Sequence, residues 1–268
     1  MDYIKRIAES VIKKQEKMFK VLLITGARQV GKTTLLKNLK PDLKYITLDD
    51  LILSQQAIED PNLFLKTNSP PIIIDEVQYA PQILRGIKVI VDKNEQKARY
   101  YLTGSQQFNL MKNVSESLAG RVGILNLLGL SLREITNINF TEPFMPTEQY
   151  LNKRNKTLKD ISYEEIWDII HKGSMPALYS QETDFEMFYS TYVNTYIERD
   201  VRNLTQVGDT LSFLKFMTAL ASRIGQILNL NSIANEVGIT IPTAQRWLSI
   251  LVSSNIVYIL EPYYNNIM

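Results

Sequence analysis

The sequence contains no cysteine and a single histidine, His171, among its 268 residues. These shortages exclude disulfide bonds and thiolate metal sites and leave no basis for a zinc site. We interpret His171 as an exposed or capping residue without a catalytic role. No apolar run reaches the roughly 18 residues of a membrane span, and residues 1–20 predict a polar amphipathic helix rather than a signal peptide. We therefore expect a cytoplasmic protein that makes no membrane contact.

Excess charge is also scarce, because 30 basic residues face 28 acidic ones and leave a net charge of +2. This is too little to draw the whole surface to nucleic acid, so any such binding has to be local. At roughly 150 residues per domain the length suggests about two domains. The 45% hydrophobic and 22% charged residues are typical of a globular chain.

One short stretch, VLLITGARQVGKTTLL over residues 21–36, carries the clearest chemical signal. Its Gly-bounded part fits the phosphate-binding pattern G-x-x-x-x-G-K-[ST]. Residues 21–25 predict a buried parallel strand, and a helix is expected from Thr33 to just before Pro41. Such a strand-loop-helix unit aims backbone N–H groups and the positive helix end at one anion. We take the nucleotide-binding residues to be Gly26, Ala27, Arg28, Gln29, Val30, Gly31, Lys32, Thr33 and Thr34.

Within this loop, Lys32 is predicted to reach the β- and γ-phosphates of a nucleoside triphosphate, and the Thr33 hydroxyl to ligate Mg²⁺. Gly26 and Gly31 permit unusual backbone angles and close approach. The pattern does not determine Arg28, which either touches phosphate or faces water.

A second motif, PPIIIDEVQYAP, places two carboxylates at the end of an apolar strand over residues 72–74. We expect Asp75 to belong to the Mg²⁺ shell and Glu76 to activate the attacking water. An acid directly after the metal-binding Asp is expected of enzymes that hydrolyse the triphosphate, whereas small-molecule kinases generally lack it. The motif is weak alone and strong beside a phosphate loop.

Two further candidates follow a third predicted strand, in ARYYLTGSQ. If this strand lies between the first two in the sheet, Ser105 sits near the γ-phosphate and can hydrogen-bond the water; otherwise it simply ends a strand at a Gly turn. Arg121 follows a short helix and precedes another apolar strand. It is either a finger that neutralises transition-state charge or a surface residue at a helix end.

Together, GARQVGKTTLL, LDD (residues 48–50), IIIDEVQ, LTGSQ and ESLAGR resemble the bacterial and archaeal AAA-type ATPases that carry a DUF4143-type C-terminal region. The resemblance continues in YIERDVR (196–202) and in residues 216–264. It implies ATP as nucleotide, Walker A at 26–33, Walker B at Asp75 and Glu76, Ser105 or Gln106 as sensor, and Arg121 as arginine finger or sensor. Members usually continue into a nuclease-like region, so we expect this chain to be a truncated or split form.

The second half predicts helices. Residues 141–160 are polar and contain two prolines, which indicates a linker. Aromatic residues at helical spacing predict one amphipathic helix over 185–197, with ion pairs expected among residues 198–200. From Leu230 the pattern predicts a helix-turn-helix with Gly238 and Thr240 at the turn, a buried stripe at Ala244, Trp247, Leu248 and Leu251, and a strand or wing after it.

Residues 203–268 carry three basic and three acidic side chains, so this segment offers few positive charges for contacts with the phosphates of a DNA duplex. Thr243, Gln245 and Arg246 can read bases if the module binds DNA, and the alternative is a winged helix that docks protein.

The expected fold is α/β: a P-loop core with a parallel sheet over residues 1–140, a linker and helical segment over 141–210, and a winged helix-turn-helix over 211–268. The expected function is Mg²⁺-dependent ATP hydrolysis that drives a conformational switch or remodelling. The alternatives are an ATP-gated DNA-binding regulator and a small-molecule kinase, which Glu76 argues against. The partners would be ATP and an unknown protein. Arg121 acting on a neighbour's nucleotide requires a homo-oligomer, whereas action in its own subunit needs only a monomer.

Overall fold

The computed structural model divides into two compact units, residues 1–185 and 186–268. It describes residues 3–105, 107–138, 140, 142–157, 161–180, 183–196 and 210–262. The domain limits expected from the sequence, 140/141 and 210/211, stay predictions. None of the described helices is both long and apolar enough to cross a membrane.

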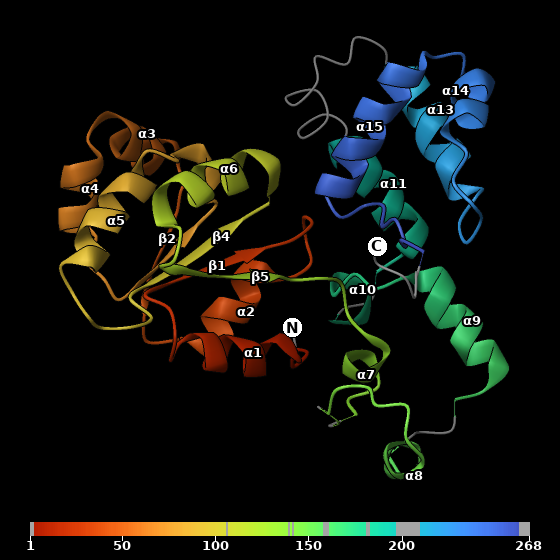
Figure 1. Cartoon of the computed structure of the whole chain (residues 1–268), viewed down its shortest axis with the longest axis horizontal. Helices are drawn as coiled ribbons and strands as arrows, with labels where there is room; N and C mark the ends of the chain where they lie inside the picture. The colour runs from red at the N-terminus through yellow and green to blue at the C-terminus, as the bar shows by residue number, and fades with distance from the viewer. Residues whose placement is uncertain are drawn as a thin grey trace, which may run out of the picture. The chain divides into compact units, whose positions relative to one another are not determined.

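The first unit is built on a five-stranded parallel sheet with the order β2-β3-β4-β1-β5 (Figure 1). The strands are β1 (Val21–Thr25), β2 (Lys44–Thr47), β3 (Ile72–Asp75), β4 (Tyr100–Gly104) and β5 (Val122–Asn126). The order confirms that the strand before Ser105 lies between the strand of the phosphate loop and the strand of the two acids. All three strands therefore deliver their polar ends to one edge.

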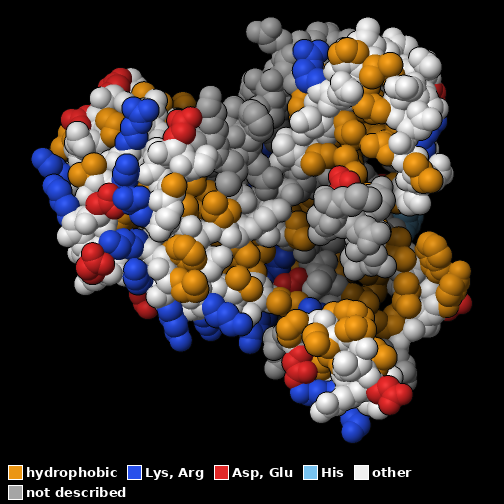
Figure 2. All heavy atoms as spheres, in the orientation of Figure 1, with side chains coloured by type: hydrophobic (Ala, Val, Ile, Leu, Met, Phe, Trp, Pro, Cys, Tyr) orange, Lys and Arg blue, Asp and Glu red, His pale blue; other side chains and the backbone are white. Residues whose placement is uncertain are grey.

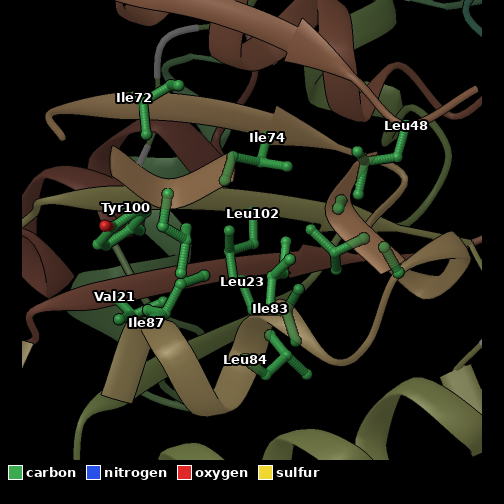
Figure 3. Close-up of a cluster of buried hydrophobic side chains, with 14 of the residues drawn as sticks. Val21, Leu23, Leu48, Ile72, Ile74, Ile83, Leu84, Ile87, Tyr100 and Leu102 are labelled. Atoms are coloured by element: carbon green, nitrogen blue, oxygen red, sulfur yellow. The ribbon is translucent and has the colours of Figure 1, made fainter. Parts of the chain in front are cut away.

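Apolar side chains cover both faces of the sheet. The helices on one face are α3 (Leu51–Glu59), α4 (Pro61–Thr67), α5 (Ile83–Asp92) and α6 (Gln107–Leu118), and on the other α1 (Ala8–Gln15) and α2 (Lys32–Leu39). Val21, Leu23 and Ile74 point into the first core and meet Leu84 and Ile87 of α5 there (Figure 3). Because β1, β3 and β4 are buried along their whole length, they read as continuous apolar runs.

After β5 the first unit continues with short helices: α7 (Leu132–Ile135), α8 (Glu148–Asn155), α9 (Tyr163–Lys172) and α10 (Ala177–Ser180). Helix α8 lies inside the segment expected to be a linker. Thr147 caps its first turn, and Tyr150 meets Phe140 and Phe144 edge-to-face at 5.7 and 5.5 Å between ring centroids. These aromatic contacts supply the packing that the polar composition does not predict. His171 is exposed in the last turn of α9, edge-to-face with Phe185.

The second unit is helical in its described part, with α11 (Phe185–Tyr196), α13 (Thr210–Ala221), α14 (Leu230–Val237) and α15 (Ile241–Ser253). Gly238 ends α14 in the left-handed conformation at φ 79°, and the Thr240 side chain caps α15. Trp247 meets Phe213 and Phe216 edge-to-face at 5.2 and 5.6 Å. The expected helix-turn-helix and its buried stripe are confirmed.

The wing is not confirmed, because residues 254–262 form no strand and residues 263–268 lie outside the described residues. The ion pairs expected among residues 198–200 also fall outside them, as does Gln106.

Candidate nucleotide-binding site

The phosphate loop turns sharply between β1 and α2. Gly26 has φ 144° and Gly31 has φ 91°, both in the region that favours glycine, and Gln29 also has a positive φ, of 60°. A Cβ on Gly26 would lie 2.2 Å from the Leu127 carbonyl oxygen, so only glycine fits beside the end of β5. The loop can therefore pack this closely against the end of β5 only because Gly26 has no side chain.

Lys32 begins α2 and is only 6% exposed. Its Nζ donates to the carbonyl oxygens of Gly26 at 3.0 Å and Ala27 at 2.8 Å. The ammonium group therefore lies within the curve of the loop, where an incoming phosphate oxygen can compete for its protons. A compact charge with three donors suits this position.

Asp75, at the end of β3, is the hub of a hydroxyl cluster. It is 5% exposed and accepts hydrogen bonds from three hydroxyl groups. Thr33 Oγ1 of α2 donates at 2.9 Å to Oδ1, Tyr45 OH of β2 donates at 2.8 Å to Oδ2, and Thr103 Oγ1 of β4 also donates to Oδ1. Burial, together with the hydrogen bond to Asp75, raises the pKa of Tyr45, which keeps it a donor. The residues predicted to hold metal, Thr33 and Asp75, are thereby brought together.

This donor set fits Mg²⁺. A hydroxyl and a carboxylate 2.9 Å apart are hard oxygen ligands, and Mg²⁺ is usually bound by one or two carboxylates with the substrate's phosphates and water completing its shell. Within the described residues no group of three or more His, Asp or Glu side chains is placed to hold a metal by itself. The site suits a magnesium ion that arrives with a nucleotide.

Glu76 follows directly, in the left-handed conformation at φ 58°, which turns the chain into a short 3-10 helix, η1 (Val77–Tyr79). Its backbone N–H donates to Thr103 Oγ1 at 3.1 Å. Its carboxylate Oε2 accepts from the Gln78 amide and, at 3.4 Å, from Ser105 Oγ. Ser105 is 7% exposed. A non-glycine residue with positive φ at a strand end is a strained conformation typical of functional sites.

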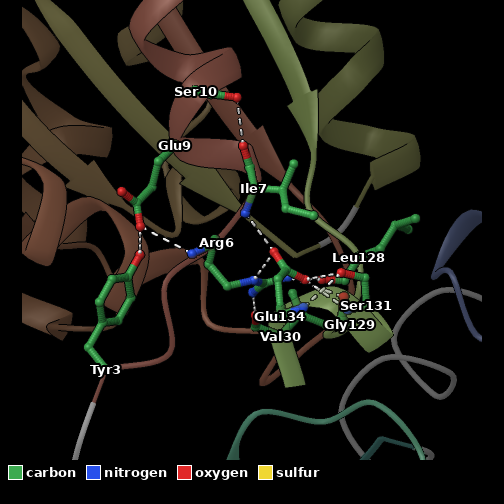
Figure 4. Close-up of polar contacts among 10 residues, drawn as sticks. All are labelled: Tyr3, Arg6, Ile7, Glu9, Ser10, Val30, Leu128, Gly129, Ser131 and Glu134. Carbon is green, nitrogen blue, oxygen red and sulfur yellow. Dashed lines mark hydrogen bonds and ion pairs between the residues drawn. The ribbon is translucent and has the colours of Figure 1, made fainter. Parts of the chain in front are cut away.

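A second polar network, centred on Arg6 and Glu134, contacts the phosphate loop (Figure 4). Arg6 is 5% exposed and pairs through Nε with Glu134 Oε1 at 3.0 Å. Its Nη1 donates to the Val30 carbonyl of the phosphate loop at 2.8 Å, and its Nη2 to the carbonyls of Leu128 at 2.7 Å and Gly129 at 3.2 Å. One guanidinium group therefore joins the N-terminal segment, the phosphate loop and the segment after β5.

The buried Glu134 carboxylate has hydrogen-bond donors besides Arg6, which offset the cost of removing its charge from water. Its carboxylate also accepts from the backbone N–H groups of Ile7 and Ser131, both at 2.7 Å. Burial alone raises the pKa of Glu134, but the hydrogen bonds from Ser131 and Ile7 and the charge of Arg6 outweigh it and hold the pKa below its usual value.

Arg121 is not brought to this cluster. Arg121 directly precedes β5, whereas the phosphate loop follows β1. Because β1 and β5 are parallel neighbours, the two lie at opposite ends of the strands. A five-residue strand at roughly 3.3 Å per residue separates them by about 16 Å. The Arg121 guanidinium instead forms an ion pair with Asp92 at the end of α5, with Nη2 at 3.0 Å from Oδ2. In this structure Arg121 therefore stands away from the phosphate loop of its own chain.

Sequence reasoning missed Arg6, Tyr45, Gln78, Thr103 and Glu134. For Thr103 a signal existed, because it ends the strand that was considered as a neighbour of the one ending in Asp75. Gln78 stood inside a quoted motif. Nothing in the local sequence pairs Arg6 with Glu134, which lies 128 residues away.

Comparisons with known proteins agree with this geometry. Residues 18–136 match the family model for an AAA domain, and residues 163–268 match a domain of unknown function, DUF8612. The expected DUF4143-type region is not shown, because the matching model is a different one. The chain is 28% identical over 250 residues to the Mycobacterium tuberculosis protein Rv2008c, covering 92% of this chain and 51% of the relative.

A protein of Methanocaldococcus jannaschii, MJ1544, is 26% identical over 226 residues, which cover 79% of this chain and 50% of the relative. The chain thus spans about half the length of the curated relatives it matches. Among solved structures, the Walker-type ATPase PABY2304 of Pyrococcus abyssi shares the fold with a TM-score of 0.55 at 15% identity, covering 95% of this chain and 90% of that one. Residues 18–136 thus match an AAA domain model and lie in a unit that shares its fold with a Walker-type ATPase.

Proposed function

We propose that this protein binds and hydrolyses MgATP and uses the nucleotide state to switch the conformation of its C-terminal region. One observation carries the proposal: Lys32, the Thr33–Asp75 pair and the Glu76–Ser105 pair converge at the carboxyl edge of one sheet. That edge is where open α/β sheets bind their ligands.

Each residue has a role that its position suits. Lys32 and the loop N–H groups bind the β- and γ-phosphates, and Thr33 and Asp75 hold Mg²⁺, which neutralises charge on the transferring group when bound. Glu76 takes a proton from the attacking water, and Ser105 orients the Glu76 carboxylate through the contact at 3.4 Å. Positioning and charge stabilisation account for most of the catalysis in phosphoryl transfer.

The test is ATP binding by Lys32→Ala. Removing the ammonium group takes away the buried cation at the end of the loop, and truncating one partner of a buried charge pair typically costs 2–5 kcal/mol, so the ATP dissociation constant should rise by about 30-fold or more. Isothermal titration with MgATP measures it. Lys14→Ala, which removes an exposed lysine of α1, is the matched control. Wild-type affinity in Lys32→Ala would refute the proposed site.

We assign the helix-turn-helix to protein docking, because residues 211–268 carry only three basic side chains (Lys215, Arg223 and Arg246) against two acidic ones (Glu236 and Glu261), a net charge of +1. One of the three basic side chains, Arg223, is already paired with Glu236. Residues 1–140 hold 20 basic and 14 acidic side chains, whereas residues 141–268 hold 10 and 14. Figure 2 shows Lys and Arg side chains spread over the first unit. Steady-state ATP turnover should therefore be measured with and without duplex DNA. Stimulation of turnover by DNA would favour a DNA-binding regulator.

We propose further that Arg121 acts on the nucleotide of a neighbouring copy, since it lies too far from its own. Mixing Arg121→Ala with Lys32→Ala should then restore part of the ATP turnover that each variant lacks, because one copy supplies the arginine and the other the intact phosphate loop. Arg85→Ala, an exposed arginine of α5, should keep wild-type turnover. A mixture no faster than its separate components, or a fully active monomer, would rule out this role.

A further inference from the structure

Gln78 contacts the proposed water-activating carboxylate from within the same turn. The 3-10 helix that follows Glu76 brings the side chain two residues ahead back toward it. The Gln78 Nε2 group donates to Glu76 Oε2 and lies 3.4 Å from Ser105 Oγ. Both partners stand at the ends of neighbouring strands, β3 and β4. Gln78 therefore bridges the two residues proposed to manage the attacking water.

The orientation of the Gln78 amide follows from its neighbours. Rotating the amide by 180° would set its carbonyl oxygen against the Glu76 carboxylate, and two acceptors repel each other. The N–H group therefore faces Glu76, and the carbonyl oxygen Oε1 faces away. That oxygen is buried and has no hydrogen-bond donor among the described residues. Buried acceptors are nearly always paired, so an unpaired one beside a reactive carboxylate indicates a place for a donor.

We propose that Gln78 positions the attacking water together with Glu76. Its N–H group fixes one carboxylate oxygen of Glu76, and its Oε1 accepts a hydrogen bond from the water. The water oxygen then bonds to the γ-phosphorus as the bond from that phosphorus to the β–γ bridging oxygen breaks. One water proton passes to Glu76, the other stays directed at Gln78, and ADP leaves with the bridging oxygen. This inference rests on the proposed function and adds a residue to it.

The experiment compares Gln78→Met and Gln78→Glu with the wild type. Met keeps the length of the side chain without its hydrogen bonds, and Glu keeps an acceptor but replaces the N–H donor with a second carboxylate oxygen beside Glu76. Hydrogen bonds to charged groups are worth a factor of about 10 to 100, so kcat should fall by about that factor in both variants. KM, the MgATP dissociation constant and Tm should stay at wild-type values, because the hydrogen bonds described for Gln78 go to Glu76 and Ser105 and not to the phosphate loop or Asp75.

Gln82→Met is the matched control, since Gln82 is exposed four residues further along and makes no described side-chain hydrogen bond. Glu76→Gln is measured in parallel. Wild-type kcat in both Gln78 variants, with Glu76→Gln inactive, would overturn the role of Gln78 alone. A fall in Tm or in ATP affinity alongside kcat would assign Gln78 a structural role instead. Wild-type protein without Glu76-dependent turnover would overturn both this role and the proposed function.

Discussion

Replacing Glu76 with Gln is expected to lower the ATP turnover number by about 10²- to 10⁴-fold, the usual contribution of a general base. The amide has the shape of the carboxylate but cannot accept a proton. Its contacts with Ser105 and Gln78 are with neutral groups, so the substitution leaves the surrounding packing in place. MgATP should bind as it does to the wild type, because the proposed phosphate and Mg²⁺ ligands are Lys32, Thr33 and Asp75 rather than Glu76.

Steady-state phosphate release and equilibrium binding of MgATP separate the two effects. Glu116→Gln makes the same chemical change at an exposed position on α6 and should retain full turnover. If Glu76→Gln hydrolysed ATP at the wild-type rate, water activation would have to be assigned to another residue. If it lost ATP binding instead, Glu76 would belong to the binding site rather than to the chemistry.

Replacing Arg6 with Ala is expected to lower the free energy of unfolding by about 3–5 kcal/mol, because the buried Glu134 carboxylate loses its countercharge. The carbonyl groups of Val30 and Leu128 lose their donor in the same substitution. Since Val30 belongs to the phosphate loop, MgATP affinity should fall together with stability. Urea unfolding followed by far-ultraviolet circular dichroism measures the first effect, and nucleotide titration measures the second.

The same pair makes stability depend on pH. Because the folded-state pKa of Glu134 lies below its usual value, its contribution is present above the ordinary carboxyl pKa of about 4.3 and is lost as the pH falls through the lower folded value. In Arg6→Ala part of the lowering disappears, so this acid-induced loss should become smaller. Lys5→Ala, at the exposed neighbouring position, is the control. Wild-type stability in Arg6→Ala would contradict the stabilising role of the Arg6–Glu134 pair.

Several elements could be predicted because their signals are local. The strand over residues 21–25 was predicted to the residue, since a strand buried on both faces needs a continuous apolar run. The turn at Gly238 and the cap at Thr240 followed equally from the backbone angles and hydrogen bonds that such residues favour. Strand β2 (Lys44–Thr47) was not predicted, because it is short, lies at the sheet edge and is only partly buried.

The sequence by itself determined the chemistry at the end of β1 and β3, because a phosphate loop and a pair of acids are defined by residue types within a few positions of each other. Only the tertiary structure decided what surrounds them. The sheet order places Thr103 between the two acids, and burial pairs Arg6 with Glu134 across 128 residues. The parallel pairing of β1 with β5 also places Arg121 at the amino ends of these strands, whereas the phosphate loop lies at their carboxyl ends. Local spacing specifies a backbone turn, whereas contacts between distant segments depend on which strands lie side by side.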